Sequence, residues 1–371
     1  MTATILREVV ASTIDADRPE IVLPTGDQWD DLWADARDER AVAAFAQALH
    51  DGRVRGTDDQ AATIVDAHES AMRACLRLER VALDVTADLA AAGIETRLLK
   101  GPATARLDYD DPAWRSFGDV DLLVRSEDYD ATVDHLRAQG ARRRSAEPRP
   151  GFDRRFGKGV CLIRPDGVQV DLHRTLAAGP FGLTVEPDVL FDGTEPLTMG
   201  DRTVLALDVE RRFLHACFHA VLGDFPPRLT ALRDVARLVR GGRVDLDRTR
   251  DLARRWRAGV VVASAVATAW SVLALPRSST VDWAFTYVPS RYERTALAAY
   301  LGSGRSYARQ MAAAIPAIRG LRPKLSYASA LLFADGAYVA GRDGGYARRL
   351  RRAATSGFDA RRSPAPSVGE R

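Results

Sequence analysis

Two aspartates separated by a single residue open an apolar segment near position 120. Residues 118–124 read Gly-Asp-Val-Asp-Leu-Leu-Val, which predicts a strand that follows a glycine turn. Because successive side chains of a strand point to opposite faces, Asp119 and Asp121 share one face while the aliphatic residues cover a core. Neighbouring carboxylates repel each other unless a cation neutralises them, and hard oxygen ligands favour Mg²⁺ or Mn²⁺. The pair is therefore a candidate metal site, with a solvated strand end as the alternative.

A third acid, Asp171, lies on another predicted strand. Residues 160–164 and 168–172 are apolar alternating segments, and the Pro-Asp-Gly between them is typical of a hairpin turn. Valines and a leucine occupy the core-facing positions of the second segment, so Asp171 lies on its polar face. If this strand lies beside that of Asp119, three carboxylates converge, as a two-metal displacement site requires.

A strand expected over 94–99 ends at Lys100 and Gly101, and Pro102 suits the first turn of a helix. The glycine lets backbone approach a phosphate closely, the lysine supplies a point charge, and helix N-terminal amides attract anions. We interpret this turn as a triphosphate contact; a plain turn with a solvent lysine is the alternative. Arg115, in the loop before the acids, could bind phosphates or hold the carboxylate strand in place.

These motifs resemble the uncharacterised nucleotidyltransferase family of the DNA polymerase beta-like superfamily. The likeness is strongest over 98–175, which contains Leu-Leu-Lys-Gly-Pro-Ala, Arg115, Gly-Asp-Val-Asp-Leu-Leu-Val and Val-Asp-Leu-His. It continues more weakly through 213–219 and 232–235. Lys-Gly replaces the usual superfamily Gly-Ser.

The resemblance implies a set of site residues. The superfamily's catalytic acids, which bind the metal ions, correspond to Asp119, Asp121 and Asp171. The predicted nucleotide-binding residues are Lys100, Gly101, Arg115 and Gly118.

Three histidines are candidates for substrate binding. His173 could orient the third acid or meet the substrate. His215 and His219 are four apart on a predicted helix and could chelate zinc, although no glutamate follows the first as the metalloprotease motif needs. We favour packing against Asp234, and the resemblance suggests that this helix caps the active site.

Basic residues also flank the predicted hairpin. Arg142–Arg144, Arg154, Arg155 and Lys158 could line a channel for a nucleotide or an acidic substrate; solvated loop charge is the alternative.

Composition limits the class of protein. The 371 residues are 46% hydrophobic and 28% charged, as in ordinary globular proteins, and the net charge of +3 is too small to argue for nucleic-acid binding. Three widely spaced cysteines argue against a disulfide framework, and the N-terminus lacks a signal-peptide pattern, so we expect a cytoplasmic protein. The uncharged segment 259–275 is short for a membrane span and contains hydroxyl residues. We expect a buried helix there and no stable membrane insertion.

We predict an α+β (mixed α/β) fold in four parts. Residues 1–93 form an N-terminal helical region that covers the sheet and includes a long helix over 61–92. Residues 94–208 form a nucleotidyltransferase core with a small mixed sheet. Residues 209–352 form a C-terminal helical domain, and 353–371 a disordered tail.

The expected function is metal-dependent transfer of a nucleoside monophosphate from a nucleoside triphosphate, for example ATP, to an unidentified acceptor. That acceptor could be a small molecule, peptide, protein or RNA, and the last would make the protein similar to nucleotidyltransferase toxins. The alternative is a non-catalytic module on the same fold that binds a nucleotide, a peptide or a partner, because a fold does not fix a function.

Overall fold

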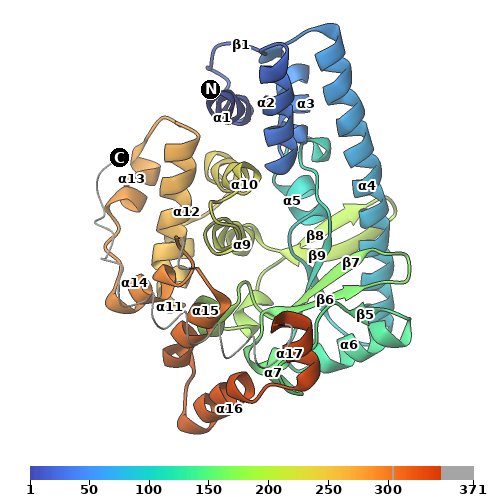
Figure 1. Ribbon diagram of the computed structural model, residues 1–371, viewed down its shortest axis with the longest axis vertical. Helices are drawn as coiled ribbons and strands as arrows, with labels where there is room; N and C mark the ends of the chain where they lie inside the picture. Colours follow the sequence, from blue (N-terminus) through green and yellow to red (C-terminus); the bar gives the residue numbers. More distant parts are fainter. Residues whose placement is uncertain (303–304, 344–371) are drawn as a thin grey trace.

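The computed structural model describes residues 1–302 and 305–343, and it is built around a seven-stranded mixed sheet (Figure 1). The strand order across the sheet is β5-β6-β7-β4-β3-β9-β8. The strands are β3 (Thr96–Leu98), β4 (Val120–Val124), β5 (Arg142–Arg143), β6 (Gly159–Ile163), β7 (Gln169–His173), β8 (Thr194–Met199) and β9 (Arg202–Leu207). The α+β fold is confirmed, and these strands all lie between residues 96 and 207.

The centre of the sheet brings together segments that are distant in sequence. β4 pairs in parallel with β7 and antiparallel with β3, while β3 pairs in parallel with β9. The chain returns from β4 to β7 through α6 (Tyr129–Ala138), β5, α7 (Phe152–Phe156) and β6. The predicted hairpin of β6 and β7 is confirmed, and β8 and β9 form a further hairpin. The carboxylate strand and the third-acid strand are therefore neighbours.

The long helix α4 (Asp58–Ala91) covers one face of the sheet (Figure 1). Its buried face packs in one apolar cluster with β3, β4, β6, β7 and α6. The helix begins three residues earlier than the apolar pattern indicates, because Thr57 and Gln60 form a capping box that satisfies free backbone amides.

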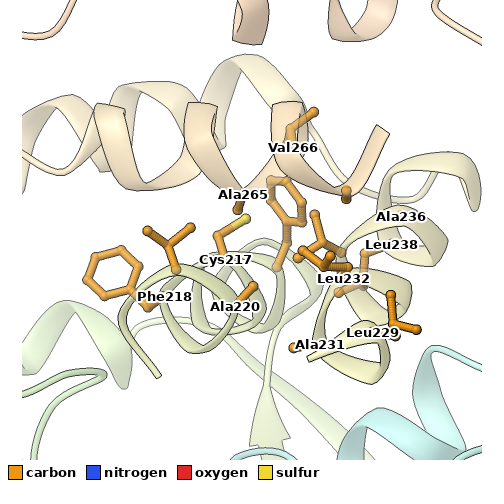
Figure 2. Packing of buried hydrophobic residues seen from close by; sticks show 14 of the residues in the cluster. Cys217, Phe218, Ala220, Leu229, Ala231, Leu232, Ala236, Leu238, Ala265 and Val266 are labelled. Atoms are coloured by element: carbon orange, nitrogen blue, oxygen red, sulfur yellow. The ribbon is translucent and has the colours of Figure 1, made fainter. Parts of the chain in front are cut away.

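A second apolar core joins the two ends of the chain. The N-terminal helices α1 (Thr2–Ser12), α2 (Asp27–Asp38) and α3 (Val42–His50) share this core with α9 (Val209–Leu222), α10 (Leu229–Arg240) and α12 (Gly259–Val272). Figure 2 shows α12 packed across α9 and α10, with Cys217 of α9 pointing to Ala265. The expected cover over the sheet is thus α4, whereas α1–α3 pack on the helical domain. A small parallel ribbon, β1 (Ile21–Val22) with β2 (Val54–Arg55), accompanies them.

The remaining elements are α5 (Pro102–Leu107), η1 (Pro112–Trp114), α8 (Gly179–Thr184), η2 (Asp188–Leu190), α11 (Leu246–Arg255), α13 (Ser279–Thr286), α14 (Arg291–Ala298), α15 (Tyr307–Ala314), η3 (Ile315–Ala317), α16 (Leu321–Leu332) and α17 (Gly336–Asp343). The buried helix predicted over 259–275 is confirmed as α12. Within the described ranges, every helix is too short or too polar to cross a membrane. The predicted tail, 353–371, lies outside the described residues.

Candidate active site

Two of the three candidate acids are direct neighbours across the parallel pair β4–β7. Asp121 is in register with Asp171, so their side chains leave the same face of the sheet. Asp121 is completely buried, Asp171 is partly buried, and Asp119 lies two residues before Asp121 on the same face. The expected convergence of the three carboxylates follows from this register.

Lys100 supplies positive charge at the same point. Its Nζ lies 3.1 Å from Oδ2 of Asp121 and 3.8 Å from Oδ2 of Asp119. Burial by itself would lower the pKa of Lys100, but the carboxylates of Asp121 and Asp119 outweigh it and hold that pKa above its usual value. Burial, and then the charge of Asp121, raise the pKa of Asp119. The lysine predicted to contact phosphates is therefore paired with the acids predicted to hold metal.

His173 fixes the orientation of Asp121. Its Nε2 donates a hydrogen bond to Oδ1 of Asp121 at 2.8 Å, so it orients the β4 acid and not Asp171. Burial, with Lys158 and Lys100 nearby, lowers its pKa well below the usual value, which favours the neutral imidazole. The ring of His215, also buried, lies edge-on to His173 with 6.2 Å between centroids. A neutral histidine that orients a carboxylate is typical of the surroundings of a metal ligand.

The donor atoms fit a divalent cation. One ligand atom each from Asp121, Asp171 and His173 lies within 4.8 Å of the other two, a geometry that Asp119 is not part of. Oδ1 of Asp171 is buried and accepts no hydrogen bond from the described residues, and the Lys100 ammonium lies 3.1 Å from Oδ2 of Asp121. A buried carboxylate oxygen without a donor is costly, and a divalent cation held between Asp121 and Asp171 would satisfy Oδ1 of Asp171.

Among the basic residues that flank the hairpin, Lys158 lies close enough to Asp121, Asp171 and Asp119 for their charges to act on its ammonium. It precedes β6, and its backbone carbonyl accepts a hydrogen bond from Arg174 just after β7. Burial and then Lys100 lower its pKa, while Asp121, Asp171 and Asp119 oppose them. Within the described chain its ammonium has no carboxylate partner inside 4 Å. Arg154 and Arg155, in contrast, are exposed.

Arg115 is occupied by a buried ion pair. Its Nε and Nη2 donate to the carboxylate of Asp234 on α10, at 3.0 Å and 2.9 Å, and the hydroxyl of Tyr109 donates to the same carboxylate at 2.7 Å. Arg233 donates to the carbonyl of Trp114 at 2.8 Å. Of the two interpretations of Arg115, this geometry favours the one in which it holds the loop that leads into Asp119.

A second buried pair holds the start of the same loop. Arg212 of α9 donates two hydrogen bonds to Asp108, at 2.7 Å and 3.0 Å, and both side chains are nearly inaccessible. The sequence gives no signal for this pair, because its members are 104 residues apart.

His215 and His219 line one small cavity with Lys100, Arg115 and Asp234, among other residues. The cavity holds about 20 Å³, enough for the centre of a single water molecule. The expected proximity of the two histidines to Asp234 is present. Cys217 between them points into the helical core, as the helical period requires.

The two glycines of the site differ in whether the backbone at that position requires a glycine. Gly101 has φ +63°, a conformation that other residues rarely adopt, and a Cβ there would lie 3.5 Å from the carbonyl oxygen of Asp119. Gly118 is exposed, and a Cβ there would meet no atom within 4 Å. Gly101 is therefore needed by the backbone itself, whereas Gly118 leaves open space in front of Asp119.

A family model described as "Uncharacterised nucleotidyltransferase" matches residues 25–274, well over half of the chain. The chain belongs to this family. The matched range contains β4, β7, α9 and α10, and hence every residue of the site described above. Membership in this nucleotidyltransferase family suggests a transferase and implies a nucleotide substrate.

Among solved structures, the chain is similar to an antigenic nucleotidyltransferase-like protein from Paracoccidioides brasiliensis. The two share 16% identity over 55% of this chain and 95% of that one, with a TM-score of 0.35. A comparison with curated proteins finds no match.

Proposed function

We propose that this member of the nucleotidyltransferase family transfers a nucleoside monophosphate from a nucleoside triphosphate, with ATP as a candidate donor, to an acceptor hydroxyl, phosphate or amine. The observation that carries the proposal is the register of Asp121 with Asp171, which puts their two carboxylates side by side in a poorly solvated site. An oxygen-rich site of this kind suits hard divalent cations shared with substrate phosphates.

The three acids and His173 would have different roles in the reaction. Asp119, Asp121 and Asp171 would hold Mg²⁺ or Mn²⁺, which when bound would offset the negative charge on the α-phosphate and the leaving pyrophosphate. His173 keeps the carboxylate of Asp121 in one orientation through its 2.8 Å hydrogen bond. Asp171, which is more accessible than Asp121, would help to activate the acceptor.

The cations and the loop complete the site. Lys100 and Lys158 would bind the phosphates, since both interact with the charges of the acids and both are only partly exposed. Arg115 acts at a distance from the chemistry, because its pairing with Asp234 holds the loop before Gly118. We keep the cytoplasm as the proposed location and leave the acceptor open.

The test is label transfer from each of four radiolabelled nucleoside triphosphates, with Mg²⁺ or Mn²⁺ and a cell extract as the source of acceptor. We expect transfer and pyrophosphate release by the native protein, and at least a hundredfold loss in Asp119→Asn and in Asp121→Asn, by analogy with the loss of other electrostatic groups at transition states. Asp134→Asn is the matched control, because that carboxylate is exposed on α6. Metal-dependent nucleotide binding without transfer would favour the non-catalytic module, and no nucleotide binding at all would refute the proposal.

A further inference from the structure

The acids of the candidate metal site already have a counter-cation within the protein. Lys100 Nζ lies 3.1 Å from Asp121 and 3.8 Å from Asp119, each time at Oδ2. Asp121 is completely buried, so its charge would be very unfavourable without a compensating cation. The ammonium therefore stabilises the folded chain in the absence of metal.

The same ammonium opposes the binding of a metal ion. His173 occupies Oδ1 of Asp121, so a divalent cation bound to Asp121 would need Oδ2, which Lys100 now contacts. Two cations at that distance repel each other strongly in a poorly solvated site. Metal entry thus requires Lys100 to move. Its side chain is flexible and partly exposed, and the neighbouring ammonium of Lys158 repels it.

We propose that Lys100 is the resident counter-cation of the metal-free site and couples metal binding to nucleotide binding. In the absence of nucleotide it competes with the divalent cation for Asp119 and Asp121. The phosphates of an incoming nucleotide offer Lys100 a new anionic partner, and its departure frees the carboxylates for the metal. This inference rests on the proposed function, to which it adds that metal alone binds poorly and that metal and nucleotide bind cooperatively.

The test measures Mn²⁺ affinity without nucleotide, by calorimetry and by electron paramagnetic resonance. Lys100→Met should bind Mn²⁺ at least tenfold more tightly than the native protein, because the competitor is gone. Lys100→Arg keeps the charge and should stay close to native. Lys158→Met is the matched control, because Lys158 carries the same charge in the same surroundings but does not contact the acids. Its gain in Mn²⁺ affinity should be clearly smaller than that of Lys100→Met.

Cooperativity supplies a second measurement. A non-hydrolysable triphosphate analogue should raise the Mn²⁺ affinity of the native protein by a larger factor than that of Lys100→Met. Adding Asp121→Asn to Lys100→Met should abolish the gain, which locates the ion at these acids. Equal or weaker Mn²⁺ binding by Lys100→Met would overturn the inference.

Melting temperatures test the same inference if Lys100→Met is less stable than the native protein. Mn²⁺ should raise the melting temperature of Lys100→Met by more than it raises that of the native protein, since the ion takes over the role of the ammonium. An equal or smaller rise would contradict the inference. If the native protein transfers label but the native protein and Lys100→Met bind Mn²⁺ equally, this inference alone is refuted. If the native protein binds no nucleotide, the proposed function is refuted.

Discussion

The ion pair between Arg115 and Asp234 should be one of the most sensitive points of the structure. Asp234→Asn keeps the size of the side chain but removes the charge that faces a buried guanidinium. The pair is bidentate, both partners are buried, and Tyr109 donates a further hydrogen bond to the same carboxylate. Removing one partner of a buried pair costs about 3–5 kcal/mol, because the other charge stays behind without compensation. We expect a loss of this size in the free energy of unfolding.

Guanidinium denaturation followed by tryptophan fluorescence measures the loss. The matched control is Glu69→Gln, which breaks an exposed pair with Arg73 on α4 and should change stability by at most about 0.5 kcal/mol. Tyr109→Phe removes a single hydrogen bond and should cost about 1 kcal/mol. The double variant Arg115→Met with Asp234→Leu should be more stable than Asp234→Asn, because the guanidinium of Arg115 no longer remains buried without its carboxylate.

Two results would refute this reasoning. One is a decrease of less than about 1 kcal/mol in the free energy of unfolding of Asp234→Asn, since a buried uncompensated charge destabilises the folded state by more than that. The other is an Arg115→Met variant that keeps its stability and shows only a raised KM for the nucleotide, which would make Arg115 a phosphate ligand. If Arg115 positions the loop, Arg115→Lys should lower kcat as Asp119 shifts, while KM for the nucleotide changes little.

Two further predictions concern the strand and the histidines beside the acids. A Cβ at Gly159 would lie 1.9 Å from the carbonyl oxygen of Leu172, so Gly159→Ala should lower the denaturation midpoint by the equivalent of about 2 kcal/mol or more. Gly118→Ala, where a Cβ meets open space, should match the native protein. Equal midpoints for the two variants would contradict the close approach of β6 to β7. The pKa values of His173, His215 and His219 are held well below the usual 6.5 by burial and by nearby positive groups, so below pH 6.5 the unfolded chain binds protons that the folded chain does not. Stability should therefore be complete above that pH and fall at lower pH by up to about 1 kcal/mol per histidine for each pH unit. His215→Gln should remove about a third of the loss between denaturation at pH 7 and at pH 5.5. A loss that His215→Gln leaves unchanged would show that other groups titrate.

Local patterns in the sequence were sufficient for the strands of the site. Alternation fixes which side chains share a face, so Asp119 and Asp121 are placed together by residues 118–124 alone. The Pro-Asp-Gly turn likewise fixes the hairpin that carries Asp171, and the 3.6-residue period separates Cys217 from the two histidines. These features depend on a few consecutive residues, which is why they were predictable.

Packing between distant segments was not predictable in the same way. The extent of α4 depends on a cap at Thr57, and the place of α1–α3 depends on apolar faces of α10 that periodicity alone cannot match to a partner. The sequence left two roles open for Arg115, and the choice between them depends on Asp234, which is 119 residues away.

The sequence by itself therefore determined the chemistry of the site: which acids share a face, which lysine follows the first strand, and which hairpin carries the third acid. The tertiary structure alone decided the pairings: Asp121 with Asp171 in register, Lys100 between two carboxylates, His173 on Asp121 and Arg115 on Asp234. The physical reason is the distance along the chain over which each effect acts. Alternation and turn chemistry act over a few residues of the chain, whereas the compensation of a buried charge depends on whichever group the fold brings within 4 Å of it.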